Sequence, residues 1–88
     1  MRIKQGFVMR EVAGQTVIVA TGEAARGFRG MIKVNAAGRI IWQGITDGLD
    51  EAAIVERIVA AFDVTRDTAE HDVAAFVAQM RDNGFLTA

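Results

Sequence analysis

MIKVNAAGRIIWQGI, residues 31–45, is predicted to contain a strand, a helix and the residue that separates them. Met31–Val34 is a short run that suits a strand. Asn35 is a favoured N-cap residue, because its side-chain oxygen accepts a hydrogen bond from a backbone N–H of the first helical turn. Three apolar residues after it share one helix face: Ile41, Trp42 and Ile45. The chain is therefore expected to change from strand to helix at Asn35, with Trp42 half-buried in the core.

The sequence before this stretch is rich in strand-forming residues. Phe7–Val12 and Thr16–Ala20 both suit strands, and Ala13–Gln15 connects them. Gly14 in this connection can adopt a positive φ, so the segment predicts a β-hairpin with a three-residue loop. Residues 21–30 contain three glycines and are expected to form a flexible loop. The short sequence Gly27–Gly30 is followed by a strand rather than a helix, which argues against a phosphate-binding loop.

The sequence after this stretch predicts two further helices. Asp50 is expected to cap a helix over Glu51–Phe62, whose apolar residues recur at helical spacing: Ile54, Val55, Ile58, Val59 and Phe62. Asp67 and Glu70 have the spacing of a capping box at the start of the last helix. That helix carries a second apolar stripe: Ala69, Val73, Phe76, Val77 and Met80. Gly84 is expected to end it, after which Phe85 and Leu86 fold back onto the core.

The order of these elements predicts the fold class. Three strands followed by three helices (βββααα) indicate an α+β domain, in which a three-stranded antiparallel sheet packs against the helices. The length of 88 residues fits one domain spanning residues 1–88.

The composition argues against several classes of function. The chain has no cysteine, so it lacks thiolate metal ligands and thiol nucleophiles. It also has no serine, which excludes a serine nucleophile. Its one histidine, His71, stands between two carboxylates on a polar helix face and is expected to be solvated. We therefore expect no enzyme activity, no metal and no cofactor. The net charge of −1 argues against a general nucleic-acid binder, and no apolar run is long enough for a membrane span. A cytoplasmic protein is expected.

Three stretches of the sequence resemble a known family. They are residues 31–42, Asp47-Gly48, and the C-terminal third with Phe62–Asp67, Asp72–Phe76 and Asn83–Leu86. In order and spacing they are similar to the coenzyme PQQ synthesis protein D (PqqD-like) family over about residues 6 to 87. The sequence departs from that family in Thr21–Gly30, and Thr46 stands where a cysteine is often found. These departures indicate that a peptide bound by this chain could differ from the PQQ precursor.

The resemblance implies a winged-helix-like fold known as a RiPP recognition element. Such modules bind the leader segment of a ribosomally made precursor peptide. They present it to a modifying enzyme, often a radical SAM maturase, and they have no catalytic residues of their own.

A leader peptide would bind such a module by adding a strand to a free sheet edge. The third strand is the expected edge, and its residues are Met31, Ile32, Lys33 and Val34. By family analogy, a groove lies between this strand and the last helix, with four candidate lining residues: Val73, Phe76, Val77 and Met80. Helix amphipathicity alone places Val73 and Phe76 in the core, so Val77 and Met80 are the better candidates for the groove. Three cations are candidates for contact with acidic leader residues: Lys33, Arg66 and Arg81.

Two other functions remain open from the sequence. The first is a winged-helix DNA-binding domain, which would need base-reading side chains on a recognition helix. The second is a structural subunit that holds an enzyme complex together without contacting substrate. The free third-strand edge could also pair two copies of the chain into a homodimer.

Overall fold

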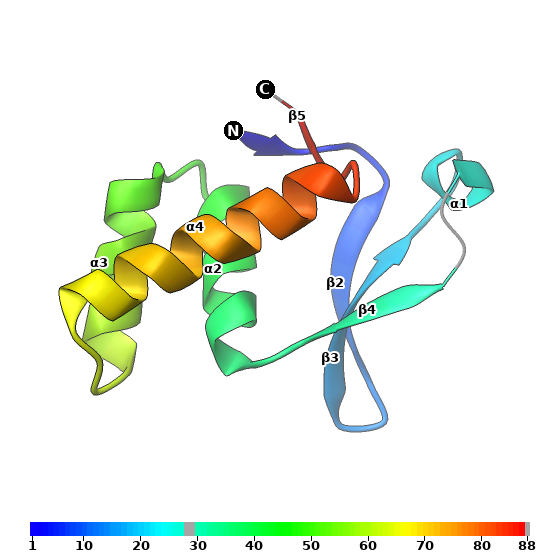
Figure 1. Cartoon of the computed structure of the whole chain (residues 1–88). Coiled ribbons are helices and arrows are strands. Elements are labelled where there is room, and N and C mark those ends of the chain that lie inside the picture. Colours follow the sequence, from blue (N-terminus) through cyan, green and yellow to red (C-terminus); the bar gives the residue numbers. More distant parts are fainter. Residues whose placement is uncertain (28–29, 88) are drawn as a thin grey trace.

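The computed structural model describes residues 1–27 and 30–87 and has the predicted α+β architecture (Figure 1). The predicted order of three strands and three helices is confirmed, and the structure adds a short helix and two short strands. The elements are β1 (Arg2–Ile3), β2 (Phe7–Val12), β3 (Gln15–Ala20), α1 (Ala24–Gly27), β4 (Met31–Val34), α2 (Ala36–Thr46), α3 (Glu51–Ala61), α4 (Arg66–Asp82) and β5 (Leu86–Thr87).

The main sheet is an antiparallel meander in the order β2-β3-β4. Its hairpin has a two-residue loop rather than the predicted three, because Gln15 pairs with Val12 and belongs to β3. Both loop residues have positive φ angles, 52° at Ala13 and 78° at Gly14. This is the pattern of a type I′ turn, whose twist matches that of the strands. The loop is therefore one residue shorter because Ala13 accepts a left-handed conformation.

Short elements that the sequence analysis missed lie outside this meander. α1 lies inside the segment predicted as a loop, and Phe28 and Arg29 of that segment lie outside the described residues. β1 and β5 form a separate two-stranded sheet, in which Arg2 pairs with Thr87 and Ile3 with Leu86. This pairing brings the first and last described parts of the chain side by side (Figure 1).

Side-chain caps define where the helices begin. Asn35 accepts a hydrogen bond from the backbone N–H of Gly38 at 2.8 Å, and Asp50 caps α3 as predicted. The prediction that Asp67 caps α4 is wrong: the N-cap is Thr65, whose hydroxyl accepts from the N–H of Thr68 at 3.2 Å. Asp67 lies within the first turn of α4, where its carboxylate interacts favourably with the helix dipole.

The core has two parts that meet along α4. Between the three long helices, buried apolar side chains pack together, among them Ile41, Ile45, Ile54, Ile58 and Val73. Between the sheet and the end of α4, the cluster contains Phe7, Ile18, Trp42, Met80 and Phe85. Phe85 is fully buried, and its ring centroid lies 4.5 Å from that of Phe7 and 6.3 Å from that of Trp42. The predicted return of Phe85 to the core is confirmed, and Trp42 is more deeply buried than expected, at 3% exposure.

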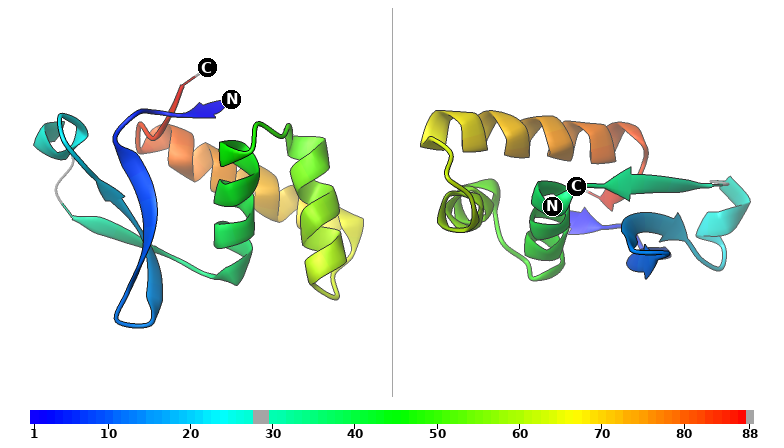
Figure 2. Two further views of the ribbon diagram at one scale, coloured as in Figure 1. Left: turned by 180° about the vertical axis from the view of Figure 1, so that it is seen from behind. Right: turned by 90° about the horizontal axis from the view of Figure 1, so that it is seen from below.

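Different elements form the two faces of the molecule. α4 forms one outer layer, with α2, α3 and the β2–β3 hairpin on its other side (Figure 2, right panel). From behind, the strands β1 and β2 and the helix α2 face the viewer, and α4 lies at the back (Figure 2, left panel). No described helix has the length and apolar character needed to cross a membrane.

Candidate functional site

The hydrogen-bonding direction of each strand follows from the hairpin. The N–H of Thr21 donates to the carbonyl of Gly6 at 2.6 Å, and Val12 and Gln15 close the two-residue turn. In an antiparallel pair, hydrogen-bonded and non-hydrogen-bonded residue pairs alternate. Even-numbered residues of β2 therefore bond to odd-numbered residues of β3, and even-numbered residues of β3 point their backbone groups toward β4.

The same alternation identifies the free backbone groups of β4. Ile32 and Val34 pair with Ile18 and Thr16 and use their N–H and C=O groups within the sheet. The N–H and C=O groups of Met31 and Lys33 point away from β3. They face the open edge of the sheet, because β4 is the last strand in the order β2-β3-β4. The β4 edge therefore presents two residues that can each donate and accept a hydrogen bond.

The side chains of β4 are divided between the two faces of the sheet. Ile32 and Val34 face inward and pack against the cluster around Phe85. Met31 and Lys33 face outward, and Met31 is the most exposed large apolar residue of the described chain, at 54% exposure. An added strand would therefore have one row of side chains near the helical layer and one row on the open face of the sheet.

A hollow of about 320 Å³ lies between the start of α2 and α4, and Asn35, the residue that follows β4, is part of its lining. Its lining is mixed and includes apolar side chains as well as amide and carboxylate groups. The lining residues are Asn35, Ala37, Gly38, Ile41, Asp72, Ala75, Phe76 and Gln79. Of the four residues expected on α4 to line a groove, Phe76 alone contributes to this hollow.

The other three predicted residues of α4 are buried. Val73 and Met80 have no exposed surface and Val77 is 1% exposed, whereas Phe76 is half-buried. The expected order of burial, with Val77 and Met80 nearer the surface than Phe76, is wrong. Val77 faces the helical cluster and Met80 faces Trp42 and Phe85, because the returning C-terminal segment covers the end of α4. Helical periodicity could not reveal this cover.

A glycine allows Phe76 to lie beside β4. A Cβ atom on Gly38 would come within 2.9 Å of Cε2 of Phe76 and 3.2 Å of Cβ of Val34. These distances are shorter than ordinary van der Waals contacts, which begin near 3.4 Å. The missing side chain of Gly38 thus lets the ring pack against the start of α2.

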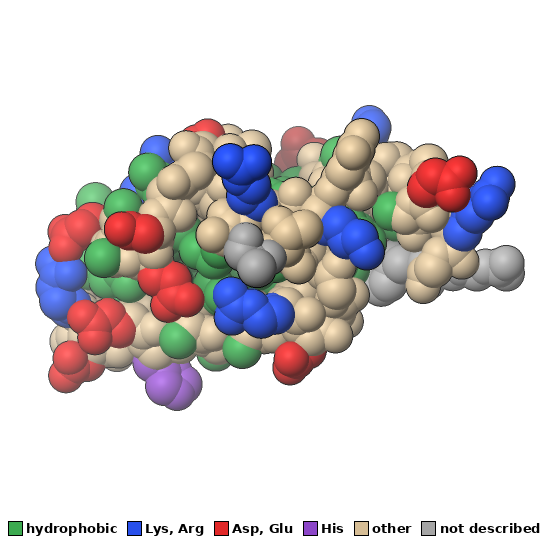
Figure 3. All heavy atoms as spheres, turned by 90° about the horizontal axis from the view of Figure 1, so that it is seen from above, with side chains coloured by type: hydrophobic (Ala, Val, Ile, Leu, Met, Phe, Trp, Pro, Cys, Tyr) green, Lys and Arg blue, Asp and Glu red, His purple; other side chains and the backbone are tan. Residues whose placement is uncertain are grey.

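The charged residues named from the sequence do not gather at one place. Lys33 and Arg81 are exposed, on β4 and on the last turn of α4. Arg66 lies at the opposite end of α4, where it forms an ion pair with Glu56 of α3. His71 is solvated as predicted, with 84% of its side chain exposed. Viewed from the end that carries both termini, acidic side chains gather over α3 and the start of α4, whereas Lys and Arg side chains are spread across the whole face (Figure 3).

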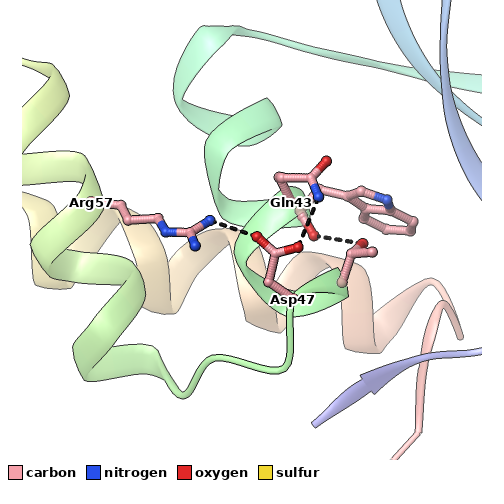
Figure 4. A network of polar contacts seen from close by, with 5 residues as sticks. Gln43, Asp47 and Arg57 are labelled. Atoms are coloured by element: carbon pink, nitrogen blue, oxygen red, sulfur yellow. Dashed lines mark hydrogen bonds and ion pairs between the residues drawn. The ribbon is translucent and has the colours of Figure 1, made fainter.

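A polar network joins α2 to α3 on another part of the surface (Figure 4). Arg57 donates from Nη1 to Oδ2 of Asp47 at 2.8 Å, and Gln43 donates from Nε2 to Oδ1 at 3.0 Å. The Arg57 guanidinium, and then the Gln43 amide, hold the pKa of Asp47 below its ordinary value. The Arg57 contact thus joins the C-terminal end of α2 to α3. Within the described residues, no three His, Asp or Glu side chains come together as metal ligands would.

Residues 15–86 match the family described as coenzyme PQQ synthesis protein D (PqqD). The chain belongs to the PqqD family. No curated protein matches the sequence. The PqqD match covers β3, β4, the three long helices and the first residue of β5, and therefore includes the β4 edge and Phe76.

Two solved structures have the same fold as this PqqD-family chain. One is TbiB1 in complex with the TbiA(beta) leader peptide, with a TM-score of 0.81 and 23% identity, over 100% of this chain and 96% of that one. The other is lasso peptide synthetase B1 complexed with the leader peptide, with a TM-score of 0.79 and 21% identity, over 99% and 96%. At these identities the likeness establishes the fold.

Proposed function

We propose that this chain is a non-catalytic recognition module that captures the leader segment of a ribosomally synthesised precursor peptide and presents it to a modifying enzyme. The free edge of β4, with the hollow around Phe76 beside it, is the observation that carries the proposal. Membership of the PqqD family supports it, as does the fold shared with two proteins whose structures contain a leader peptide.

Strand addition explains how β4 would bind the leader. Met31 and Lys33 offer two N–H and two C=O groups at the edge, so the leader gains up to four backbone hydrogen bonds. Each contributes about 0.5–1.5 kcal/mol net, which offsets only part of the cost of ordering a disordered leader. The remaining affinity must come from side chains that enter the hollow around Phe76. Backbone bonds thus give affinity, and alternate side chains give specificity.

The exposed cations favour a leader that carries acidic residues. Lys33 lies on the outer face of the edge strand, beside the outward row of an added strand. Arg81 lies on the last turn of α4, the end of the helix that packs with β4 around Phe85. We therefore expect an apolar leader residue over Phe76, with carboxylates flanking it. The buried Val73, Val77 and Met80 would shape the floor under Phe76 without touching the peptide.

The partners follow from this role. Besides the leader peptide, the partner would be a modifying enzyme, which by family analogy is a radical SAM maturase. The complex would form in the cytoplasm, where precursor peptides are made.

A homodimer formed through the β4 edge would use the same backbone groups as the leader. Leader binding would then dissociate it, which size-exclusion chromatography with and without the peptide can measure.

The test is a titration of the 15N-labelled chain with the leader of a precursor encoded near its gene. Micromolar or tighter binding, with the largest amide shifts at Met31–Val34 and Phe76, supports the proposal. Lys33→Pro removes one edge donor without breaking a bond to β3, so it should weaken binding about two- to tenfold more than Lys33→Ala. An absence of shifts at high peptide excess, with binding only to the enzyme, would favour a purely structural subunit.

A further inference from the structure

The sheet has a second free edge, on β2. Even-numbered residues of β2 form the hydrogen bonds to β3, as described above. The N–H and C=O groups of the odd-numbered Met9 and Glu11 therefore point away from β3. β2 is the other terminal strand of the sheet order β2-β3-β4, so within the described residues no strand pairs with this edge. The molecule therefore has two strand-addition edges, on opposite sides of one sheet.

A groove of about 650 Å³ runs beside the β2 edge and is larger than the hollow near β4. Its volume is in the range of ordinary ligand sites. β1, β2 and the C-terminal end of α2 form its walls, and these elements face the viewer from behind, with α4 on the far side (Figure 2, left panel). The lining includes Arg2, Phe7, Met9, Trp42, Thr46 and Asp47.

The charges at the groove indicate which chemistry it can accept. The carboxylate of Asp47 is already engaged by Arg57 and Gln43 (Figure 4). Within the described residues, Arg2 has no carboxylate within 4 Å, although it lines the groove. Met9, which is half-buried, and the small exposed parts of Phe7 and Trp42 form its apolar lining. The groove thus suits an extended backbone that carries an apolar side chain and, near Arg2, an acidic one.

We infer that the β2 edge and its groove bind an extended, acidic segment of the modifying enzyme while the leader occupies β4. The inference rests on the proposed function, because a module that presents a bound leader needs a second surface for the enzyme. The two edges lie on opposite sides of the sheet, so both can be occupied at once. The module would then join enzyme and substrate through one continuous sheet.

A second copy of the chain fits this edge less well. Two antiparallel β2 strands that both use Met9 and Glu11 would place Arg10 opposite Arg10 of the second copy. Like charges directly opposite each other in a sheet are destabilising. The enzyme segment carries no such constraint, and Arg2, which lines the groove, favours an acidic partner.

Photo-cross-linking of the full chain in cells that naturally express it tests the inference. The probe is p-benzoylphenylalanine in place of Thr46, which is exposed and lines the groove. A second probe replaces Gln79, which lines the hollow beside Phe76. Mass spectrometry identifies each adduct. The expected result is a peptide-modifying enzyme captured at Thr46, through a segment with an acidic residue, and a precursor peptide captured at Gln79.

Matched edge variants show whether backbone pairing is involved. Met9→Pro and Met9→Ala both remove the side chain, but only Met9→Pro removes an N–H from the β2 edge. Met9→Pro should lower the yield of the Thr46 adduct about two- to tenfold relative to Met9→Ala and leave the Gln79 adduct unchanged. Circular dichroism confirms that both variants fold.

The other possible outcomes contradict either the enzyme-docking inference or the leader-binding proposal. Capture at Thr46 of the precursor, of a second copy of the chain, or of nothing would overturn the enzyme-docking inference. Equal yields from Met9→Pro and Met9→Ala would also overturn it. Failure to capture a precursor at Gln79 would instead contradict the leader-binding proposal, so the two failures can be told apart.

Discussion

Two glycines on α2 should respond differently to the same substitution. In Gly44→Ala, the new Cβ would lie 2.7 Å from Cγ1 of Ile54, a side chain with no exposed surface and no room to move. Such overpacking costs about 1–3 kcal/mol, against a gain of about 1 kcal/mol in helix propensity. We expect Gly44→Ala to lower the free energy of unfolding by about 1 kcal/mol.

Gly38→Ala meets a neighbour that can move. The new Cβ would lie 2.9 Å from Cε2 of Phe76, at the far end of a half-buried side chain. The ring can rotate toward solvent, and Cβ of Val34, at 3.2 Å from the new Cβ, needs to shift by only a few tenths of an ångström. The helix-propensity gain of about 1 kcal/mol should therefore offset most of the cost. The displaced ring would enter the hollow beside β4. Since an aromatic contact contributes about 1 kcal/mol, leader affinity should fall about fivefold.

Urea denaturation of both variants, followed by calorimetric titration with the leader peptide, measures these effects. Gly44→Ala serves as the control, because it lies on the same helix but away from Phe76. Equal destabilisation of the two variants would refute the argument that the Phe76 ring can move away from the new Cβ whereas Ile54 cannot. Unchanged leader affinity in Gly38→Ala would show that the position of Phe76 does not matter for binding.

Three further predictions concern the turn, the α4 cap and the polar network. Ala13→Asn should raise the free energy of unfolding by about 1 kcal/mol in urea melts, because Asn tolerates the φ of 52° better than Ala. Thr65→Ala should cost about 1 kcal/mol, more than Asp67→Ala, and the reverse order would restore Asp67 as the cap. Because the pKa of Asp47 is lowered in the folded state, its ion pair stabilises the fold above pH 3.8 and loses this effect as pH falls below that value. Arg57→Gln should therefore be less stable than wild type near neutral pH, and the difference should shrink in acid melts.

Local patterns were sufficient to predict much of the fold. Asn35 and Asp50 were recognisable as caps because the hydrogen bonds they accept come from residues three positions later. The start of α4 was misplaced because Thr65 and Asp67 are both plausible caps, and helical periodicity does not distinguish starts two residues apart. The β1–β5 pair was missed since each strand has two residues, and its partner is more than 80 positions away.

The candidate site was only partly predictable for the same reason. The β4 edge follows from a hairpin and a third strand, which adjacent sequence specifies. The burial of Met80 depends on Phe85 returning over it, and the position of Phe76 depends on the absent side chain of Gly38. These contacts join segments that are distant in sequence, so the stripe on α4 could not show which of its residues reaches the surface.

The pairing of Arg2 with Thr87 makes the domain nearly circular. A short linker between the two ends would close the chain without disturbing the three-stranded sheet, and new ends could open at the exposed Ala13–Gly14 turn. The same geometry would let the domain be inserted into a surface loop of another protein, entering and leaving at one point. The β4 edge would stay open in such a fusion, because β4 does not lie in the joined sheet, whereas the groove beside β2 includes Arg2 and would adjoin the host protein.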